Sequence, residues 1–305
     1  MGKIVVVGSI NMDLVAHTAA FPRPGQSVLG TSFSTFPGGK GANQCVAAAR
    51  LGGDVEMVGM VGGDAYGKEL TDLFAREGIA RRHVYVADAP TSTAIILISD
   101  QSAENEIVVI PTANYAFGSA ELKKAEAAIR SASMVVAQLE LRQEVVDELV
   151  LLCRAAGVPV MLNPAPVRGL SDEILRGVAY LTPNETELEV LSGLPAGTLD
   201  EVYAAADALL QRGVRCVVAT LGKRGALVAD AAGKTVVPGY PVKAVDTVAA
   251  GDSFNGALAT ALVAGKPVRE AAAFANAVGA LTVTKRGAIP SLPTLEEVRS
   301  FLRSR

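Results

Sequence analysis

The segment DTVAAGDSFNG at 246–256 combines a carboxylate with a run of small residues. Ala249, Ala250 and Gly251 leave main-chain N–H groups open at the start of an apolar stretch of helical length. Such N–H groups form an anion hole that stabilises the charge developing on a phosphoryl group during its transfer. Asp252, beside this anion hole, is placed to accept the proton of an attacking hydroxyl. The alternative is that Asp252 only caps the helix.

A second glycine-rich segment, PGGKGAN at 37–43, also precedes an apolar stretch. Its glycines permit the main chain to approach a ligand closely, and Lys40 and Asn43 supply hydrogen-bond donors. Glycine-rich turns before helices are common, so the segment alone is equally compatible with a structural turn. The segment at 228–235 has Val228 where a P-loop has its first glycine, so it predicts a β-hairpin turn instead. GSIN at 8–11 lacks the second glycine of a dinucleotide-binding motif.

Polar side chains follow several of the apolar runs in the chain. Asn11 and Asp13 come after the first run, Glu140 after another, and Asn184 and Glu187 after a third. In open α/β sheets, ligands bind in the crevice at the carboxyl ends of the strands. Each residue alone is explained equally well by a cap or a turn, but their shared placement predicts a binding crevice.

The composition excludes several classes of protein. The 305 residues carry 28 Lys and Arg against 31 Asp and Glu, a net charge of −3 with no basic block, which argues against binding to nucleic acid or to a membrane surface. His17 and His83 are far apart, and Cys45, Cys153 and Cys216 are isolated, which excludes a zinc site built from Cys and His pairs. Isolated cysteines predict buried, reduced thiols and a cytoplasmic protein. No apolar run approaches the roughly 18 residues that a membrane span needs.

Short runs rich in Val and Ile alternate with longer stretches rich in Ala and Leu. The short runs are typical of strands buried on both faces of a parallel sheet. They lie at 3–7, 55–61, 134–139, 158–162 and 216–221. The longer stretches have helical length, and a glycine follows most of them. They lie at 41–51, 65–77, 121–131, 143–156, 199–211, 251–264 and 268–285. This alternation predicts an α/β fold with a mostly parallel sheet and helices on both of its faces.

Two segments, at about 14–36 and 91–111, interrupt this alternation. Both lack helical periodicity and indicate strands joined by turns. Because they interrupt one α/β unit, we expect a single domain over residues 1–305 with a small β lid inserted in two pieces. An apolar sheet of this kind leaves one face exposed unless it covers a ligand or another subunit.

Together these motifs resemble the ribokinase-like (PfkB) family of carbohydrate kinases, over a stretch that runs from the first strand to Pro293. The matching motifs keep the same order along the chain. They are GSINMD at 8–13, GGKGAN at 38–43, NPAP at 163–166, NETE at 184–187, TLG at 220–222, the segment 246–256 and RGAIPS at 286–291. Ala249 stands where many members have glycine, a departure found in the ribokinase subgroup. The resemblance implies a three-layer fold whose small β-sheet corresponds to the family's β-clasp.

The resemblance further implies an activity, the ATP-dependent phosphorylation of D-ribose at O5 to give ribose 5-phosphate and ADP. Asp252 would be the catalytic base, and the main chain of Ala249, Ala250 and Gly251 would form the anion hole. Related kinases that act on deoxyribose, fructose or a nucleoside are alternatives, as is a non-catalytic ligand-binding homologue. Members of the ribokinase subgroup pair as homodimers through the lid, so the resemblance also implies a homodimer.

Ligand positions are implied residue by residue. The residues that would hold the sugar are Asn11, Asp13, Gly39, Lys40, Asn43, Glu140 and Asp252. ATP would lie along Asn184, Thr220, Gly222, Gly225, Gly251 and Asn276. Asn184 and Glu187 would act near Mg²⁺, directly or through water. An activating monovalent cation, K⁺, would be held mostly by main-chain carbonyls, at Asp246, Val248, Thr282, Lys285, Gly287 and Ser291.

Overall fold

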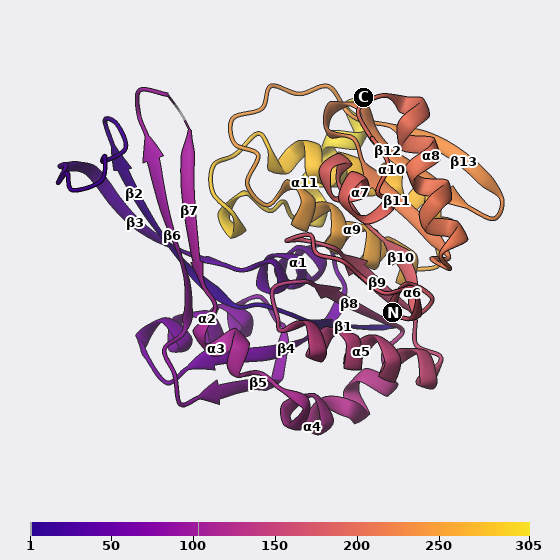
Figure 1. Cartoon of the computed structure of the whole chain (residues 1–305), viewed down its shortest axis with the longest axis horizontal. Coiled ribbons are helices and arrows are strands. Elements are labelled where there is room, and N and C mark those ends of the chain that lie inside the picture. Colours follow the sequence, from indigo (N-terminus) through magenta and orange to yellow (C-terminus); the bar gives the residue numbers. More distant parts are fainter. Residues whose placement is uncertain (1, 103) are drawn as a thin grey trace.

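A computed structural model describes residues 2–102 and 104–305, and it arranges them around two β-sheets (Figure 1). The strands of the larger sheet are β1 (Lys3–Val7), β4 (Asp54–Gly62), β5 (Ala80–Ala87), β8 (Met134–Gln138), β9 (Val160–Asn163), β10 (Val178–Leu181), β11 (Cys216–Thr220), β12 (Gly225–Asp230) and β13 (Gly233–Pro238). Their order is β13-β12-β11-β10-β9-β8-β1-β4-β5. All pairs from β11 to β5 are parallel, whereas β12 pairs antiparallel with both β11 and β13.

Alternate residues of each strand face opposite sides of the larger sheet. In β1, Val5 and Val7 pack into one apolar core, and Ile4 and Val6 pack into the other. The first core is covered by α3 (Thr112–Ala116), α4 (Ser119–Arg130), α5 (Gln143–Ala156), α6 (Asp172–Leu175), α7 (Glu185–Ser192) and α8 (Leu199–Gln211). The second is covered by α1 (Lys40–Arg50), α2 (Ala65–Arg76), α9 (Ala250–Val263), α10 (Val268–Thr282) and α11 (Leu295–Arg303). The predicted α/β class, with helices on both faces of a mostly parallel sheet, is confirmed.

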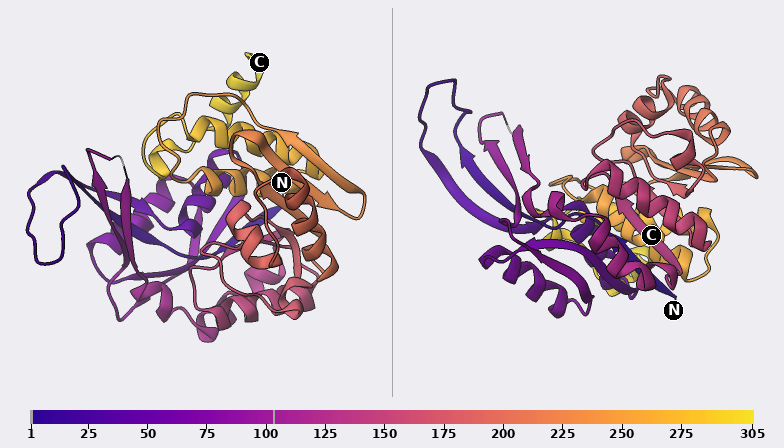
Figure 2. Two further views of the ribbon diagram at one scale, coloured as in Figure 1. Left: turned by 45° about the horizontal axis from the view of Figure 1, so that its top comes forward. Right: turned by 60° about the horizontal axis from the view of Figure 1, so that its bottom comes forward.

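The smaller sheet contains β2 (Asn11–Thr18), β3 (Gly30–Gly38), β6 (Ser92–Ser99) and β7 (Asn105–Ile110), in the order β3-β2-β6-β7. It extends away from the larger sheet at one end of the molecule (Figure 2). Strands β2 and β3 extend beyond the segment at 14–36 and reach Asn11 and Gly38, which brings both strands to the larger sheet. Strand β7 is exposed along its whole length, so this sheet keeps apolar residues such as Val108 open to solvent.

Local signals in the sequence place most element boundaries. Gly157 ends α5 in a left-handed conformation with φ 71°, as predicted. The other predicted helix-ending glycines, Gly52, Gly78, Gly213 and Gly265, also have positive φ, and Gly193 ends α7 in the same way without having been predicted. Residues 225–238 form the predicted hairpin, since β12 and β13 pair antiparallel. Strand β5 was not predicted, because Arg81 and Arg82 interrupt its apolar pattern, which an edge strand tolerates.

In the two described ranges, no helix has both the length and the apolar character to cross a membrane.

The three cysteines are buried free thiols, as predicted. Burial raises the pKa of Cys153 and of Cys216 to about 12, and it raises the pKa of Cys45 further. A thiol with a raised pKa carries little thiolate at neutral pH and is a poor nucleophile. The cysteines therefore act as small apolar residues of the two cores.

Candidate functional site

A cavity of about 170 Å³ lies at the carboxyl ends of the strands of the larger sheet. Asn163 ends β9 and Thr220 ends β11, while Thr182 and Asn184 directly follow β10. Its lining combines predicted site residues with several that were not predicted. They are Lys40, Asn163, Ala165, Thr182, Asn184, Glu187, Thr220, Thr247, Ala249, Ala250, Gly251, Asp252 and Asn255. The cavity therefore occupies the crevice where an open α/β sheet is expected to bind its ligand.

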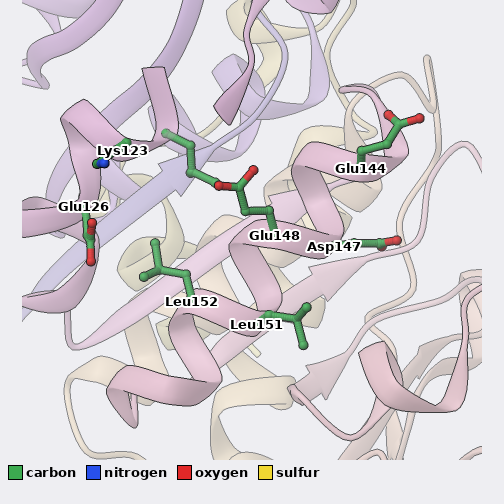
Figure 3. A pocket seen from close by; sticks show the side chains of 8 residues that line it. Lys123, Glu126, Glu144, Asp147, Glu148, Leu151 and Leu152 are labelled. Atoms are coloured by element: carbon green, nitrogen blue, oxygen red, sulfur yellow. The ribbon is translucent and has the colours of Figure 1, made fainter. Parts of the chain in front are cut away.

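A larger hollow of about 510 Å³ lies elsewhere, between α4 and α5 (Figure 3). Its lining includes Glu126, Glu144, Asp147 and Glu148 beside leucine side chains. In Figure 3 Glu148 points toward α4, where it accepts a hydrogen bond from Ser119 at 2.5 Å. None of the predicted site residues lines this hollow, so the smaller cavity is the candidate site.

Asp252 lies in the first turn of α9 and is 8% exposed. Its Oδ2 accepts a hydrogen bond from Asn43 Nδ2 at 2.8 Å, and its Oδ1 accepts one from Gln44 Nε2 at 2.9 Å. The carboxylate therefore contacts α1 rather than capping its own helix. Burial raises the pKa of Asp252 above its ordinary value, while Lys40 and the two amide donors act in the opposite direction. A buried carboxylate of this kind can accept a proton from a bound hydroxyl.

The start of α9 leaves main-chain N–H groups open beside Asp252. Ala249 has φ 59° and is the only non-glycine residue with positive φ in the described ranges. A left-handed conformation costs a residue with a Cβ roughly 1–2 kcal/mol, so its presence here marks a constrained turn. Among the described residues, the N–H groups of Gly251 and Asp252 have no acceptor, whereas Ala250 N donates to Thr247 O at 3.3 Å. A Cβ on Gly251 would meet no atom within 4 Å from elsewhere in the described part of the chain, so packing does not require glycine at this position.

The glycine-rich loop brings the start of α1 against β2. Gly39 has φ 89°, and a Cβ there would lie 2.8 Å from Asn11 N, so only glycine fits this close approach. Lys40 N donates to Glu140 Oε2 at 3.0 Å, and Lys40 Nζ lies 3.8 Å from Glu140 Oε1. Burial lowers the pKa of Lys40, but the surrounding carboxylates raise it by more, so its ammonium stays charged.

Arg168 holds the loop that carries Glu140, and it was not predicted from the sequence. Its Nη2 donates to the carbonyl of Leu139 at 2.8 Å and to that of Leu141 at 2.6 Å. These carbonyls flank Glu140 on both sides. The Glu140 carboxylate also accepts a hydrogen bond from the Ser9 hydroxyl. Glu140 is therefore fixed by its main chain and by its side chain.

Asn11 and Asp13 come from the smaller sheet and reach the same region. Asp13 has a pKa raised to about 7, first by burial and then by Glu140 and Asp252, with Lys40 acting in the opposite direction. Asn11 Oδ1 accepts a hydrogen bond from Asn114 Nδ2 at 2.7 Å. Asn114 is buried in α3, and its role could not be seen in the sequence.

Asn184 and Glu187 form a capping box at the start of α7. Glu187 N donates to Asn184 Oδ1 at 2.8 Å, while Asn184 N and Nδ2 donate to the two Glu187 oxygens at 2.9 and 3.0 Å. Both side chains line the cavity, and Asn184 forms a parallel bridge with Thr220. Burial raises the pKa of Glu187, and the nearby Lys40 lowers it.

Three residues expected along ATP do not line the cavity and lie instead toward β12 and β13. Gly222 starts the short helical turn that precedes β12, and Gly225 follows that turn with φ 99°. A Cβ on Gly225 would overlap the carbonyl of Val237. Asn276, on α10, donates to the carbonyls of Val237 and Pro238 at 3.0 and 3.1 Å.

Asp246 joins the two segments that were expected to surround a monovalent cation. Its Oδ1 accepts from Val248 N at 3.0 Å, and its Oδ2 accepts from Gly287 N at 2.9 Å. Asp246 N also donates to Val283 O at 3.2 Å. Lys285 N donates to Thr282 O at 3.1 Å in the same turn, and Ser291 is buried in the following segment. The structure thus brings the segments 246–248 and 282–287 side by side, shortly before the start of α9.

Comparison with known proteins assigns the family. Residues 1–295 match the family described as "pfkB family carbohydrate kinase". The ribokinase of Bacillus subtilis is 40% identical over 303 residues, which cover 99% of this chain and 100% of the relative. The ribokinase of Haemophilus influenzae is 39% identical over 300 residues, 98% of each chain. The structure of Arabidopsis thaliana ribokinase complexed with ribose and ATP matches with a TM-score of 0.94 and 31% identity over 99% of both chains. The chain therefore belongs to the pfkB family of carbohydrate kinases.

Proposed function

We propose that this protein transfers the γ-phosphoryl group of ATP to O5 of D-ribose, giving ribose 5-phosphate and ADP. The observation that carries the proposal is the position of Asp252, a buried hydrogen-bond acceptor beside the open N–H groups of Gly251 and of Asp252 itself. The ribokinases of two bacteria, each about 40% identical over nearly the full chain, support ribose as the sugar.

The transfer requires a base and a site for the developing negative charge. Asp252 accepts the proton of the ribose O5 hydroxyl as O5 attacks the γ-phosphorus. The new O5–P bond forms while the bond between the γ-phosphorus and the β,γ-bridging oxygen breaks, and ADP leaves. The N–H groups at 251 and 252 donate to the oxygens of the transferred group, and Lys40 adds a positive charge at the cavity wall.

The sugar site combines carboxylates and amides, which suit a polyol because its hydroxyls both donate and accept hydrogen bonds. We assign to it Asn11 and Asp13 from β2, Gly39, Lys40 and Asn43 from the glycine-rich loop and α1, and Glu140 after β8. Asn43 Oδ1 is buried and lacks a hydrogen-bond partner in the described part of the chain. A sugar hydroxyl would supply the missing donor.

Members of this kinase family use a divalent metal with ATP, and we place Mg²⁺ near Asn184 and Glu187. Both side chains offer oxygen atoms, which Mg²⁺ prefers. These oxygens already accept hydrogen bonds within the pair, since Asn184 Nδ2 donates to Glu187 Oε1 and Glu187 N donates to Asn184 Oδ1. We therefore expect these residues to hold the ion through water, with phosphate oxygens as its direct ligands. When bound, the ion would neutralise negative charge on the phosphate oxygens. Thr220, Gly222, Gly225, Gly251 and Asn276 would contact the nucleotide.

We place an activating K⁺ beside Asp246. The Asp246 carboxylate and the main-chain carbonyls of the two segments that it joins would supply the oxygen ligands. We assign the ligands to Asp246, Val248, Thr282, Lys285, Gly287 and Ser291. A cation there would fix the segment that leads into the anion hole.

We propose that residues 1–305 form a single kinase domain in which the smaller sheet is a lid. Closing the lid over the sugar excludes water, so that ATP is not hydrolysed. Ile107, Val108 and Val109 in β7 are between 49% and 60% exposed, which predicts a homodimer that buries them against a second copy. With three reduced cysteines, we place the dimer in the cytoplasm.

Release of ADP with D-ribose, deoxyribose, fructose and adenosine as acceptors tests the proposal. We expect D-ribose to give the highest kcat/KM. A higher kcat/KM for one of the other acceptors would reassign the substrate. Absence of ADP release with all four would support a non-catalytic ligand-binding protein.

A further inference from the structure

We propose that Gln44 is a positioning residue for the catalytic base, because a chain of buried amides fixes the direction of the Gln44 side chain and forces Asp252 to accept a hydrogen bond from it. The inference rests on the proposed function, in which Asp252 is the base. It assigns roles to Gln44, Asn163 and Gln138. Of these, only Asn163 lies in one of the sequence motifs, NPAP at 163–166, and that motif gave it no role.

The chain of amides starts at a main-chain carbonyl, whose polarity is fixed. The carbonyl of Thr182 can only accept, and Asn163 Nδ2 donates to it at 3.1 Å. The Asn163 amide therefore has one permitted direction, with Oδ1 turned toward Gln44. Because Oδ1 can only accept, its partner must be the amide nitrogen of Gln44, which lies 3.1 Å away.

The direction of the Gln44 amide is fixed at its nitrogen end, because both partners there can only accept. Nε2 donates to Asn163 Oδ1 and to Asp252 Oδ1, at 3.1 and 2.9 Å. Oε1 accepts from Gln138 Nε2 at 2.8 Å. Turning the amide by 180° would set its oxygen against Asn163 Oδ1 and Asp252 Oδ1, and both of these hydrogen bonds would be lost. Gln138 does not add to this constraint, because its own Oε1 has no partner among the described residues.

The other amide donor to the base differs in this respect. Asn43 Nδ2 donates to Asp252 Oδ2, but Asn43 Oδ1 has no partner within the ranges that the structure describes. No second hydrogen bond of the protein therefore fixes the direction of the Asn43 amide. Of the two donors, only Gln44 has its amide orientation fixed by a further hydrogen bond within the protein.

Because these groups are buried, the orientation of the Gln44 amide affects the protonation of Asp252. Gln44 and Gln138 are 0% exposed, Asn163 is 7% and Asp252 is 8% exposed. A proton on Asp252 Oδ1 would point at the N–H group of Gln44, so the chain of amides favours the ionised form. The charged groups that face the carboxylate are Lys40 on α1, Glu140 after β8, Asp13 on β2 and Glu187 on α7. Of these, only Lys40 favours ionisation, which makes the amide donors the principal further support for the carboxylate form.

The test compares the pH dependence of kcat in Gln44→Met with that of the wild type, with D-ribose and ATP as substrates. Methionine keeps the length of the side chain but supplies no N–H group. Loss of one hydrogen bond to a buried charge predicts a kcat lower by up to about 10-fold on the acidic limb, with a smaller change on the plateau. We expect the acidic limb of the kcat profile to move up by about one pH unit. The KM for ribose should change by less than about threefold, because Gln44 acts through Asp252 and not on the sugar.

A second variant, Gln44→Glu, keeps size and polarity and supplies the same measurement if the methionine variant does not fold. It places a carboxyl oxygen against Asp252 Oδ1, so that the two groups share a proton and the acidic limb moves further upward. Gln143→Met is the matched control. It removes another glutamine bond to a carboxylate, from Gln143 Nε2 to Asp147 Oδ1 at 2.5 Å, in residues that do not line the cavity. This control should keep the wild-type pH profile.

The outcomes separate the inference from the function on which it rests. A Gln44 variant that folds and has a wild-type acidic limb, with kcat lowered equally at every pH, overturns the positioning role. If Asp252→Asn is inactive in the same series, the proposed function still stands in that case. If Asp252→Asn turns ribose over at the wild-type rate, the base assignment fails, and the role of Gln44 fails with it.

Discussion

Replacing Asp13 by asparagine should make the protein more stable and less active. Asp13 has an ordinary pKa of 3.8, and burial, Glu140 and Asp252 raise it to about 7 in the folded protein. Between about pH 4 and pH 7 the folded state therefore binds a proton that the unfolded chain has released. The free energy of unfolding falls as the pH rises through this window, because the native state there binds more protons than the unfolded state. Above pH 7 the full cost of burying the charge remains.

The magnitude follows from the size of the shift. A change from 3.8 to about 7 is roughly three pH units, which corresponds to about 4 kcal/mol as an upper limit. Asparagine has nearly the size of the aspartic acid side chain and carries no charge. We therefore expect Asp13→Asn to raise the free energy of unfolding by about 1–4 kcal/mol at pH 8 and by much less at pH 4. Its KM for the sugar should rise, since the proposed site loses a carboxylate acceptor.

Urea unfolding of the wild type and the variant at several pH values between 4 and 8 measures this difference. Asp72→Asn is the control, because a hydrogen bond from Lys68 lowers the pKa of Asp72, so its removal should give no gain at pH 8. The reasoning is refuted if the difference in unfolding free energy between Asp13→Asn and the wild type is the same at pH 4 and pH 8. Stability would then not depend on the charge of Asp13.

Four further predictions concern the proposed base, the anion hole, the cation and the lid. Asp252→Asn should lower ribose-dependent ADP release by about 10²- to 10⁴-fold with ATP affinity nearly unchanged, and retained turnover would contradict its role. Gly251→Ala should leave the free energy of unfolding within about 0.5 kcal/mol of the wild type, because its Cβ meets no protein atom, yet sharply lower kcat; an unchanged kcat would argue against the anion hole. Exchange of K⁺ for tetramethylammonium should lower kcat sharply if a cation binds at Asp246, whereas an unchanged rate removes that site. Val108→Lys should shift the mass measured by light scattering from dimer to monomer, whereas Val86→Lys, at an exposed position outside the smaller sheet, should not; a dimer in both variants would exclude the lid as the interface.

The fold followed from the sequence wherever apolar pattern and glycine position agreed. The runs at 3–7 and 143–156 match β1 and α5 residue for residue, because one is a continuous apolar strand and the other ends at Gly157. Strand β5 escaped prediction because a strand at the sheet edge needs no continuous apolar run. The start of the smaller sheet at Asn11 was also missed, since Asn11 and Asp13 are polar and reach the site, while Met12 between them packs into a core.

The sequence predicted site residues only where the groups that act together are neighbours in the sequence. Asp252 stands beside small residues in one stretch of sequence, so its proximity to N–H groups could be inferred. Gln44 stands beside Asn43 in an equally suggestive stretch, but its partners are Asn163 and Asp252, 119 and 208 residues away. The sequence around a glutamine on an apolar helix does not show that a distant carbonyl fixes the orientation of its amide. Buried amides therefore acquire their role from the packing of α1 against the ends of β8 and β9, and only the fold can show which way each amide points.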